Sequence, residues 1–317
     1  MSLKIVVGAG GTGRATAELL AGAGHDVRLV TRRGSGPRHP HIDRIALDAT
    51  DTSGLIDVIQ GATTLFNCAA PPYHLWERQF PPLATALLNA AIATQVDYVM
   101  LGNLYGYGSV RVPMTESLPL RPNSTKGRIR AQMWADAKAA NDAGRLRATE
   151  VRASDFIGLG AISVFTLMVS PKLLAAKPAF FPADLDAPHS WSGTVDAARA
   201  LIAVSSDERS WGRAWHAPTN PAVSPRGLAA TFARVAGVRE PRLRRMPSWL
   251  LRAAALTSPT IRELVEMQYQ LRKPFVLDSS LTEGQFSLAP SPLADILREG
   301  LQGVSDSGAS DRQAASS

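Results

Sequence analysis

The sequence predicts an α/β protein with a doubly wound, Rossmann-like parallel sheet, followed by a smaller, mostly helical lobe. At the N-terminus a short apolar strand runs into a glycine-rich turn and a helix. Strands and helices then alternate through the first half of the chain, which is typical of a parallel sheet with right-handed crossovers. The 317 residues are enough for one such domain and an additional lobe.

The predicted elements follow one another in a regular order. Lys4–Val7 is apolar throughout, as in a strand buried on both faces, and Arg14–Leu20 carries apolar residues at helical spacing. The other predicted strands are Asp26–Thr31, Ile42–Leu47, Thr64–Ala70, Val96–Leu101, Arg147–Ala153 and Trp211–Ala217. The other predicted helices are Leu55–Ile59, Pro82–Thr94, Arg128–Ala143, Ser163–Leu174, Thr194–Val204, Leu228–Ala236 and Trp249–Leu271.

A change in composition near Leu159 predicts the domain organisation. Residues 1–158 are expected to form a dinucleotide-binding domain, and residues 159–302 a substrate lobe from which about 190–217 return to the first domain. The lobe is rich in large apolar residues, which indicates either a largely apolar substrate cleft or ordinary core. Residues 303–317 lack large apolar residues and are expected to be a disordered tail.

The turn after the first strand carries the clearest motif. It matches GxGxxG between a strand and a helix, the context that makes this motif significant. Gly8 permits the tight turn, Gly10 lets the backbone approach a pyrophosphate, and Gly13 allows close packing of helix on strand. The helix N-terminus directs free N–H groups at the phosphates. The cofactor-binding candidates in this turn are Gly8, Gly10, Gly11, Thr12 and Gly13.

The end of the second strand indicates which dinucleotide is bound. NAD-binding domains usually place an acidic residue there to accept hydrogen bonds from the ribose. This chain has Thr31, Arg32 and Arg33 instead. A guanidinium pairs with a 2′-phosphate, whereas a carboxylate repels it. The sequence therefore favours NADP over NAD, with a solvated basic loop as the alternative.

Charge and composition argue against several other partners. The net charge of +7 and the pI near 9.9 could suggest nucleic acid, but only six of the 34 cations are lysine and the arginines are scattered. The densest cluster, Arg242, Arg244 and Arg245, has no interleaved aromatic residues. No apolar run approaches the ~20 residues of a membrane span. Neither a nucleic-acid nor a membrane partner is expected.

The cysteine and histidine content gives a similar expectation for metals and compartment. Cys68 is the single cysteine, so an internal disulfide and a cysteine-built zinc site are excluded. The six histidines are dispersed, and no metal is expected. The first residues do not resemble a secretory signal, which predicts a cytoplasmic protein.

Several motifs together resemble an extended or atypical short-chain dehydrogenase/reductase of the NAD-dependent epimerase/dehydratase type. They are Asn67-Cys68-Ala69-Ala70, Leu104-Tyr105-Gly106, Arg152 to Gly158, and His189-Ser190-Trp191. The resemblance spans most of residues 1–300. It implies a dinucleotide-dependent enzyme that acts on a small molecule. It also implies that Asp48 binds the adenosine part and that Ala69 lies beside the cofactor.

The chain departs from this family at the catalytic positions. The family's Tyr and Lys, four residues apart, correspond here to Lys126 and Arg130, and the hydroxyl-bearing position corresponds to Leu101. A literal YxxxK at Tyr269 lies more than a hundred residues too late, and Arg14 replaces the third glycine of the usual family spacing. The fold and the cofactor carry over from the resemblance, but the usual proton transfer does not.

Substitutes for the missing acid and base can be named. Lys126 could act as a general acid beside a cationic nicotinamide. Alternatively, Lys126 and Arg130 could bind ribose, phosphate or a substrate oxyanion, or they could simply face solvent. Tyr105, after the fifth strand, is the third catalytic candidate. The substrate-contact candidates are Tyr73, His74, Asn103 and Tyr107.

Three classes of function fit these features. The first is an oxidoreductase or redox-assisted epimerase acting on a small, largely apolar organic molecule. The second is a dehydratase, isomerase or cyclase without net redox, and the third is a non-enzymatic NADP sensor that binds a partner protein. The lobe favours an enzyme. Substrate, reaction direction and a homodimeric state stay open.

Overall fold

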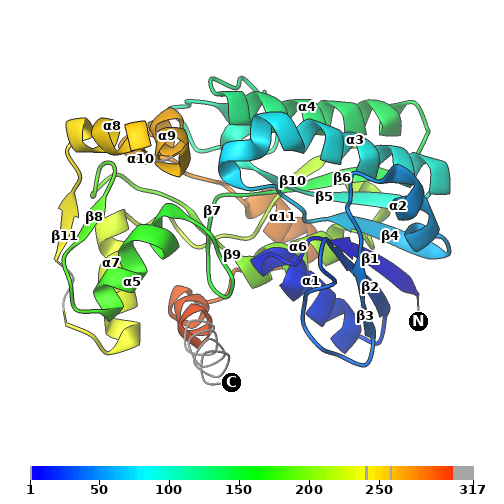
Figure 1. Ribbon diagram of the computed structural model, residues 1–317, viewed down its shortest axis with the longest axis horizontal. Coiled ribbons are helices and arrows are strands. Elements are labelled where there is room, and N and C mark those ends of the chain that lie inside the picture. The colour runs from blue at the N-terminus through cyan, green and yellow to red at the C-terminus, as the bar shows by residue number, and fades with distance from the viewer. Residues whose placement is uncertain (1, 240–241, 258, 303–317) are drawn as a thin grey trace. The chain divides into compact units, whose positions relative to one another are not determined.

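The computed structural model describes residues 2–239, 242–257 and 259–302 (Figure 1). The predicted tail, 303–317, lies outside the described residues. The chain divides into two units, each with its own hydrophobic core. The first unit comprises Met1–Ala153, Ala197–Pro218 and Leu277–Leu288, and the second comprises Ser154–Asp196, Thr219–Val276 and Ala289–Ser317.

A seven-stranded, fully parallel sheet forms the centre of the first unit, as predicted. The strands are β1 (Leu3–Val7), β2 (Asp26–Thr31), β3 (Ile42–Ala46), β4 (Ala62–Asn67), β5 (Asp97–Asn103), β6 (Ala148–Ala153) and β10 (Ala214–His216). Their order is β10-β6-β5-β4-β1-β2-β3. Because β1 pairs with both β2 and β4, the chain reverses its winding there. Ligands of such sheets bind at the carboxyl ends of the strands beside this point.

Helices cover both faces of this sheet. They are α1 (Gly11–Gly22), α2 (Thr52–Ile59), α3 (Trp76–Thr94), α4 (Thr125–Asp142), α6 (Thr194–Val204) and α11 (Ser280–Phe286), with short turns η1 (Tyr73–Leu75), η2 (Leu104–Tyr107) and η4 (Glu208–Ser210). Helices α2, α3 and α4 lie on one face, and α1 and α6 on the other (Figure 1). Side chains from α2, α3 and α4 share one core with the sheet.

Helix α3 begins six residues before the predicted start at Pro82. It includes both Pro81 and Pro82, although proline lacks the N–H that a helix interior uses. Trp76 and Phe80 lie one turn apart and are both buried in the core. Burial of these two large side chains stabilises the early start against the missing hydrogen bonds.

The second unit contains two small parallel sheets and several helices. Strand β7 (Asp155–Ile157) pairs with β9 (Trp191–Gly193), and β8 (Ala179–Phe181) pairs with β11 (Leu243–Arg245). The remaining elements are the π-helical turn η3 (Phe165–Val169) and helices α5 (Ser170–Leu174), α7 (Pro225–Ala236), α8 (Ser248–Thr257), α9 (Pro259–Glu266) and α10 (Tyr269–Arg272).

Two helices expected in this unit are divided. The predicted helix Trp249–Leu271 is three helices, α8, α9 and α10. Pro259, the first residue of α9, cannot donate a helical hydrogen bond and disfavours helical backbone before it. The predicted helix Ser163–Leu174 likewise consists of η3 followed by α5, and the change falls just before Pro171.

Candidate functional site

The glycine turn after β1 combines two positions that require glycine with one that does not. Gly8 has a φ of +98°, and a Cβ there would lie 2.7 Å from the Cα of Ala69. A Cβ on Gly13 would lie 2.0 Å from the carbonyl oxygen of Gly8. By contrast, no heavy atom lies within 4 Å of the Cβ position of Gly10. The fold itself therefore leaves open space at Gly10.

That space fits a dinucleotide phosphate. Gly10 caps the N-terminus of α1, where Gly11 and Thr12 begin the helix, and the first N–H groups of a helix have no partner within it. The N–H of Gly8 donates to the carbonyl of Val30, 2.9 Å away, and this bond fixes the turn against β2. The positive end of the helix and the open approach at Gly10 suit a pyrophosphate.

Arg32, Arg33 and Asp48 lie at the carboxyl ends of β2 and β3, and all three are exposed. The carboxylate of Asp48 accepts hydrogen bonds from the N–H and the hydroxyl of Thr50, at 3.0 and 2.8 Å. These bonds, with a smaller contribution from Arg32, lower the pKa of Asp48. Asp48 is thus ionised at neutral pH, and two guanidinium groups follow β2 where the motif predicted them.

The first turns of α4 carry Lys126 and Arg130, which are four residues apart and both buried. The ammonium of Lys126 lies 4.6 Å from the centre of the Tyr73 ring. The guanidinium of Arg130 lies 4.9 Å from the ring of Trp76 and 4.5 Å from that of Phe80. Two cations of one helix therefore pack against aromatic side chains of η1 and α3.

Arg130 is fixed in this cluster by one strong contact. Its Nη1 donates to the carbonyl of Leu101, 2.9 Å away on β5. Its Nε is buried without a hydrogen-bond partner among the described residues. Burial lowers the pKa of Arg130 to about 10, so the side chain stays positively charged at neutral pH. The carbonyl that it binds belongs to the position where the family resemblance places a hydroxyl.

The turn after β5 places a tyrosine beside this cluster. The side chain of Asn103 accepts a hydrogen bond from the N–H of Tyr105, 3.1 Å away, and so shapes η2. The ring of Tyr105 lies 6.2 Å from the ring of Trp76. The side chain of His74 is exposed on η1. The structure thus brings Tyr73 and Tyr105 to the aromatic cluster around the two cations, and Asn103 has a turn-forming role.

Tyr107 lies instead in a buried polar network. Its hydroxyl donates to Nε2 of His216 and accepts from Nη1 of Arg152, both at 2.7 Å. Arg152 also donates through Nε to the carboxylate of Glu150, 2.7 Å away. Burial raises the pKa of Tyr107 to about 12. The phenol is therefore neutral and held by two buried partners, unlike the substrate contact that its position in the loop predicted.

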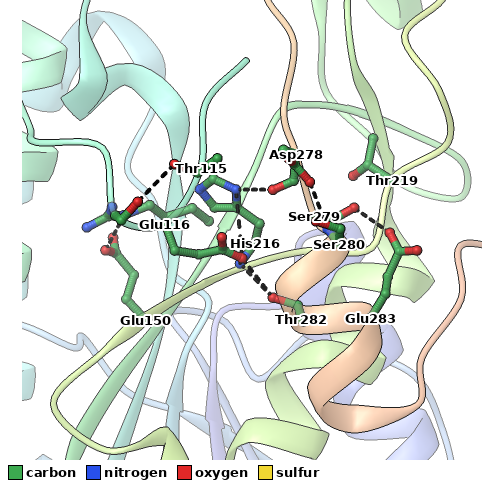
Figure 2. A network of polar contacts seen from close by, with 12 residues as sticks. Thr115, Glu116, Glu150, His216, Thr219, Asp278, Ser279, Ser280, Thr282 and Glu283 are labelled. Atoms are coloured by element: carbon green, nitrogen blue, oxygen red, sulfur yellow. Dashed lines mark hydrogen bonds and ion pairs between the residues drawn. The ribbon is translucent and has the colours of Figure 1, made fainter. Parts of the chain in front are cut away.

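His216 connects this network to the segment Leu277–Leu288, as Figure 2 shows. Its Nδ1 donates to the carbonyl of Asp278, 2.7 Å away. A carbonyl only accepts, so Nδ1 carries the proton and Nε2 accepts from Tyr107. Burial lowers the pKa of His216 to about 3, and the imidazole is neutral. One neutral tautomer therefore joins strand β10, the loop η2 and the approach to α11.

Glu116 completes the connection (Figure 2). Its carboxylate accepts from the backbone N–H of His216 at 3.2 Å and from the hydroxyl of Thr282 at 3.1 Å. Burial raises the pKa of Glu116. Sequence reasoning missed this network because its contacts join residues that are up to 166 positions apart in the chain. The motif that begins at Arg152 was visible, but nothing in the sequence pairs Arg152 or Glu116 with His216.

The described residues give little support for a cysteine nucleophile, a metal site or a membrane span. Burial raises the pKa of the Cys68 thiol to about 12, which disfavours a thiolate nucleophile. No group of three or more His, Cys, Asp and Glu side chains that could hold a metal ion occurs in the described part of the chain. Within the same residues, no helix has the length and apolar character needed to cross a membrane.

Comparison with known proteins identifies the class. The model of the NAD dependent epimerase/dehydratase family matches residues 5–214. The chain belongs to this family, which is a family of enzymes, as the sequence resemblance indicated. None of the curated proteins compared with the chain matches it.

Solved structures share the fold along nearly the whole chain. MoeE5 in complex with UDP-glucuronic acid and NAD is 19% identical, with a TM-score of 0.78 over 97% of this chain and 100% of that chain. UDP-glucose 4-epimerase from Thermotoga maritima is 16% identical, with a TM-score of 0.77 over 96% and 99% of the two chains. dTDP-glucose 4,6-dehydratase from Bacillus anthracis, in complex with NAD, is 16% identical, with a TM-score of 0.76 over 96% and 97%.

Proposed function

We propose that this protein is an NADP-dependent oxidoreductase, or a redox-assisted epimerase, that acts on a small, largely apolar organic molecule with Lys126 as its proton donor. The observation that carries the proposal is the position of the Lys126 ammonium, 4.6 Å from the Tyr73 ring at the start of α4. Tyr73 and Tyr105 follow β4 and β5. The second half of a dinucleotide extends over these strands when the first half occupies the glycine turn.

The residues around Lys126 suit proton transfer to a developing oxyanion. A bound dinucleotide supplies or accepts the hydride. An ammonium can donate a proton to a carbonyl oxygen. The nearby guanidinium of Arg130, held by Leu101 and by aromatic rings, adds positive potential that favours the anionic oxygen. The aromatic walls favour a substrate with apolar surface.

The cofactor assignment rests on the turn after β2. The glycine turn would hold the pyrophosphate, Ala69 would lie beside the cofactor, and Arg32 and Arg33 would bind a 2′-phosphate. Two exposed guanidinium groups without an acid at the end of β2 favour NADP. The structurally similar proteins MoeE5 and dTDP-glucose 4,6-dehydratase contain NAD. NAD is therefore the cofactor against which NADP must be compared.

Isotope transfer separates the two reaction types. The enzyme is incubated with NADPH deuterated at the transferable position and a panel of apolar ketones and aldehydes. An oxidoreductase moves the deuterium to the alcohol product and forms one NADP⁺ for each product molecule. A redox-assisted epimerase, given NADP⁺ and an alcohol in D₂O, inverts the carbinol carbon without net consumption of cofactor. The proposal fails if neither cofactor binds, or if binding occurs without hydride transfer in any assay.

A further inference from the structure

An arginine-rich segment of the second unit lies between Glu240 and Glu263. Between positions 241 and 262 the sequence has five arginines and no aspartate, glutamate or lysine. Arg242, Arg244 and Arg245 are exposed on and beside β11. The sequence alone shows no aromatic residues interleaved with this cluster, but the folded unit supplies them from other elements.

Strand β8 supplies the first aromatic side chain. Phe180 is the register partner of Arg244 in the parallel pair β8–β11. Both side chains are exposed, Phe180 to 40%. A large apolar side chain and a guanidinium therefore stand next to each other on the open side of this two-stranded sheet.

Helix α8, which starts three residues after β11, supplies the second aromatic side chain. Trp249, Ala253 and Leu256 are spaced by four and three residues and thus share one face of the helix. Trp249 is 70% exposed and Leu256 is 80% exposed. Leu251, on the opposite face, is buried in the unit. The helix therefore buries one apolar face and presents a second one to solvent.

We propose that this surface, made of Phe180, Arg242, Arg244, Trp249 and Leu256 and here called the α8 surface, docks the protein on a lipid surface with anionic headgroups. Tryptophan and leucine side chains enter the boundary between headgroups and acyl chains, and neighbouring arginines bind lipid phosphates. Such association requires no spanning helix. It would bring an enzyme for an apolar substrate to the phase in which that substrate dissolves.

The combination of charges and apolar groups favours lipid over other partners. A nucleic acid would use the arginines and could stack on an aromatic ring, but it offers no apolar layer for the exposed face that ends at Leu256. A second copy of the chain would place the same arginines against one another or require an acidic patch opposite them. An anionic bilayer satisfies both the guanidinium groups and the apolar face at once.

Vesicle flotation tests the proposal with the full chain. Vesicles of phosphatidylcholine alone are compared with vesicles that also contain phosphatidylglycerol. Two arginines at the surface predict roughly a thirtyfold preference for the anionic vesicles at low salt, and the preference should fall as salt rises. The double variant Trp249→Ser/Leu256→Ser should bind both vesicle types about tenfold more weakly or worse. The variant Arg242→Gln/Arg244→Gln should lose most of the preference for anionic lipid.

Matched controls distinguish binding through the α8 surface from non-specific binding to vesicles. Ile162→Ser removes another exposed apolar side chain of the second unit, 75% exposed, and Arg111→Gln removes an exposed charge of the first unit. Both should bind vesicles like the unmodified chain, and dinucleotide binding should be unchanged in all variants, which also reports on folding. If a double variant fails to fold, Trp249→Ser alone is measured.

Four results would overturn the proposal. The first two are absence of vesicle binding and a loss of vesicle binding in the control variants that equals the loss in the α8-surface variants. The third is tighter binding to duplex DNA than to anionic vesicles. The fourth is a dimer in light scattering that becomes a monomer in Trp249→Ser.

Discussion

The carboxyl ends of the parallel strands in the first unit form two regions that are built in different ways, a first end at β1–β3 and a second end at β4, β5 and α4. At β1, β2 and β3 the site is largely backbone, and it consists of the glycine turn, the N-terminus of α1 and the exposed arginines after β2. At β4, β5 and α4 the site consists of side chains, namely two buried cations and the aromatic rings against them. The first end keeps the pattern typical of dinucleotide binding. The second end carries Lys126 and Arg130 where the family resemblance places a Tyr and a Lys.

This difference shows where the sequence constrains function. Any chain that must approach a pyrophosphate needs small residues and free N–H groups, and those are readable locally. Proton transfer requires only an acidic group at the correct position, and several side chains can supply one. The chemistry can therefore change at the second end while the first end stays recognisable.

The largest effect should come from removal of the ammonium at the second end. Lys126→Met keeps the length of the side chain but cannot donate a proton. If Lys126 is the acid, turnover should fall by about 10²–10⁴-fold with little change in dinucleotide affinity. Turnover and cofactor affinity are measured on the same preparations.

Lys138→Met is the matched control, because Lys138 is a partly exposed lysine of the same helix, paired with Asp142. Tyr73→Phe and Tyr105→Phe are measured in the same assay. If Lys126→Met hardly changes turnover and either Tyr→Phe variant lowers it strongly, the acid is a tyrosine of the aromatic cluster. Lys126 would then only bind cofactor or substrate.

At the first end, Gly10→Val should weaken dinucleotide binding by about a hundredfold or more while the fold stays intact. The Cβ position of Gly10 has no neighbour within 4 Å, so valine meets the ligand rather than the protein. Gly22→Val, at another open glycine position of α1, should bind normally. Circular dichroism checks folding, and a titration with NADPH measures affinity. Normal binding by a folded Gly10→Val would place the dinucleotide elsewhere.

The parallel sheet, the glycine turn and the arginines after β2 were predictable because each depends on residues close in sequence. Helix α4 begins at Thr125, three residues before the predicted start at Arg128, and only the correspondence of Lys126 to the family's Tyr followed from its distance to neighbouring motifs. Its packing against Tyr73 did not, because the contact joins α4 to a turn about fifty residues earlier. Periodicity also failed to show that α3 begins at Trp76, since two prolines normally indicate a boundary and burial of aromatic side chains outweighed them.

Tyr107 shows the limit of reasoning from loop position. Its place after β5 suggested a substrate contact, yet the hydroxyl is enclosed by Arg152 and His216. The deciding partners come from β6 and β10, and their side chains meet only once the sheet has formed. Long-range polar networks of this kind leave no local pattern, whereas backbone motifs do.

The buried network should make stability depend on pH through His216. Its pKa is lowered to about 3 in the fold, while in the unfolded chain it is about 6.5. Below pH 6.5 the unfolded chain takes up a proton that the folded protein does not, so stability falls as the pH decreases towards 3. The slope approaches about 1.4 kcal/mol per pH unit, and the loss between pH 6.5 and 5 is about 1.6 kcal/mol.

Urea unfolding of the original chain and of His216→Gln over this range measures the effect. The glutamine can still accept from Tyr107 but does not titrate. Burial raises the pKa of Glu116 and of Glu150, and these carboxyls oppose the trend at lower pH in both proteins. The difference between the two curves therefore isolates His216. Parallel curves would show that His216 has the same pKa in the folded and unfolded states.

The smallest expected effect concerns the choice of cofactor at the first end. One charge-assisted contact to a phosphate contributes about 1.5–3 kcal/mol, so NADPH should bind at least about tenfold more tightly than NADH. Arg32→Ala/Arg33→Ala should remove this preference and leave NADH affinity nearly unchanged, because NADH has no 2′-phosphate. Arg38→Ala, an exposed arginine six residues beyond Arg32, is the control. Titrations of intrinsic fluorescence with both nucleotides give the ratio. Equal affinities of the unmodified chain for NADPH and NADH would mean that the arginines after β2 face solvent. The backbone of the glycine turn alone would then bind the dinucleotide, and it does not distinguish the two cofactors.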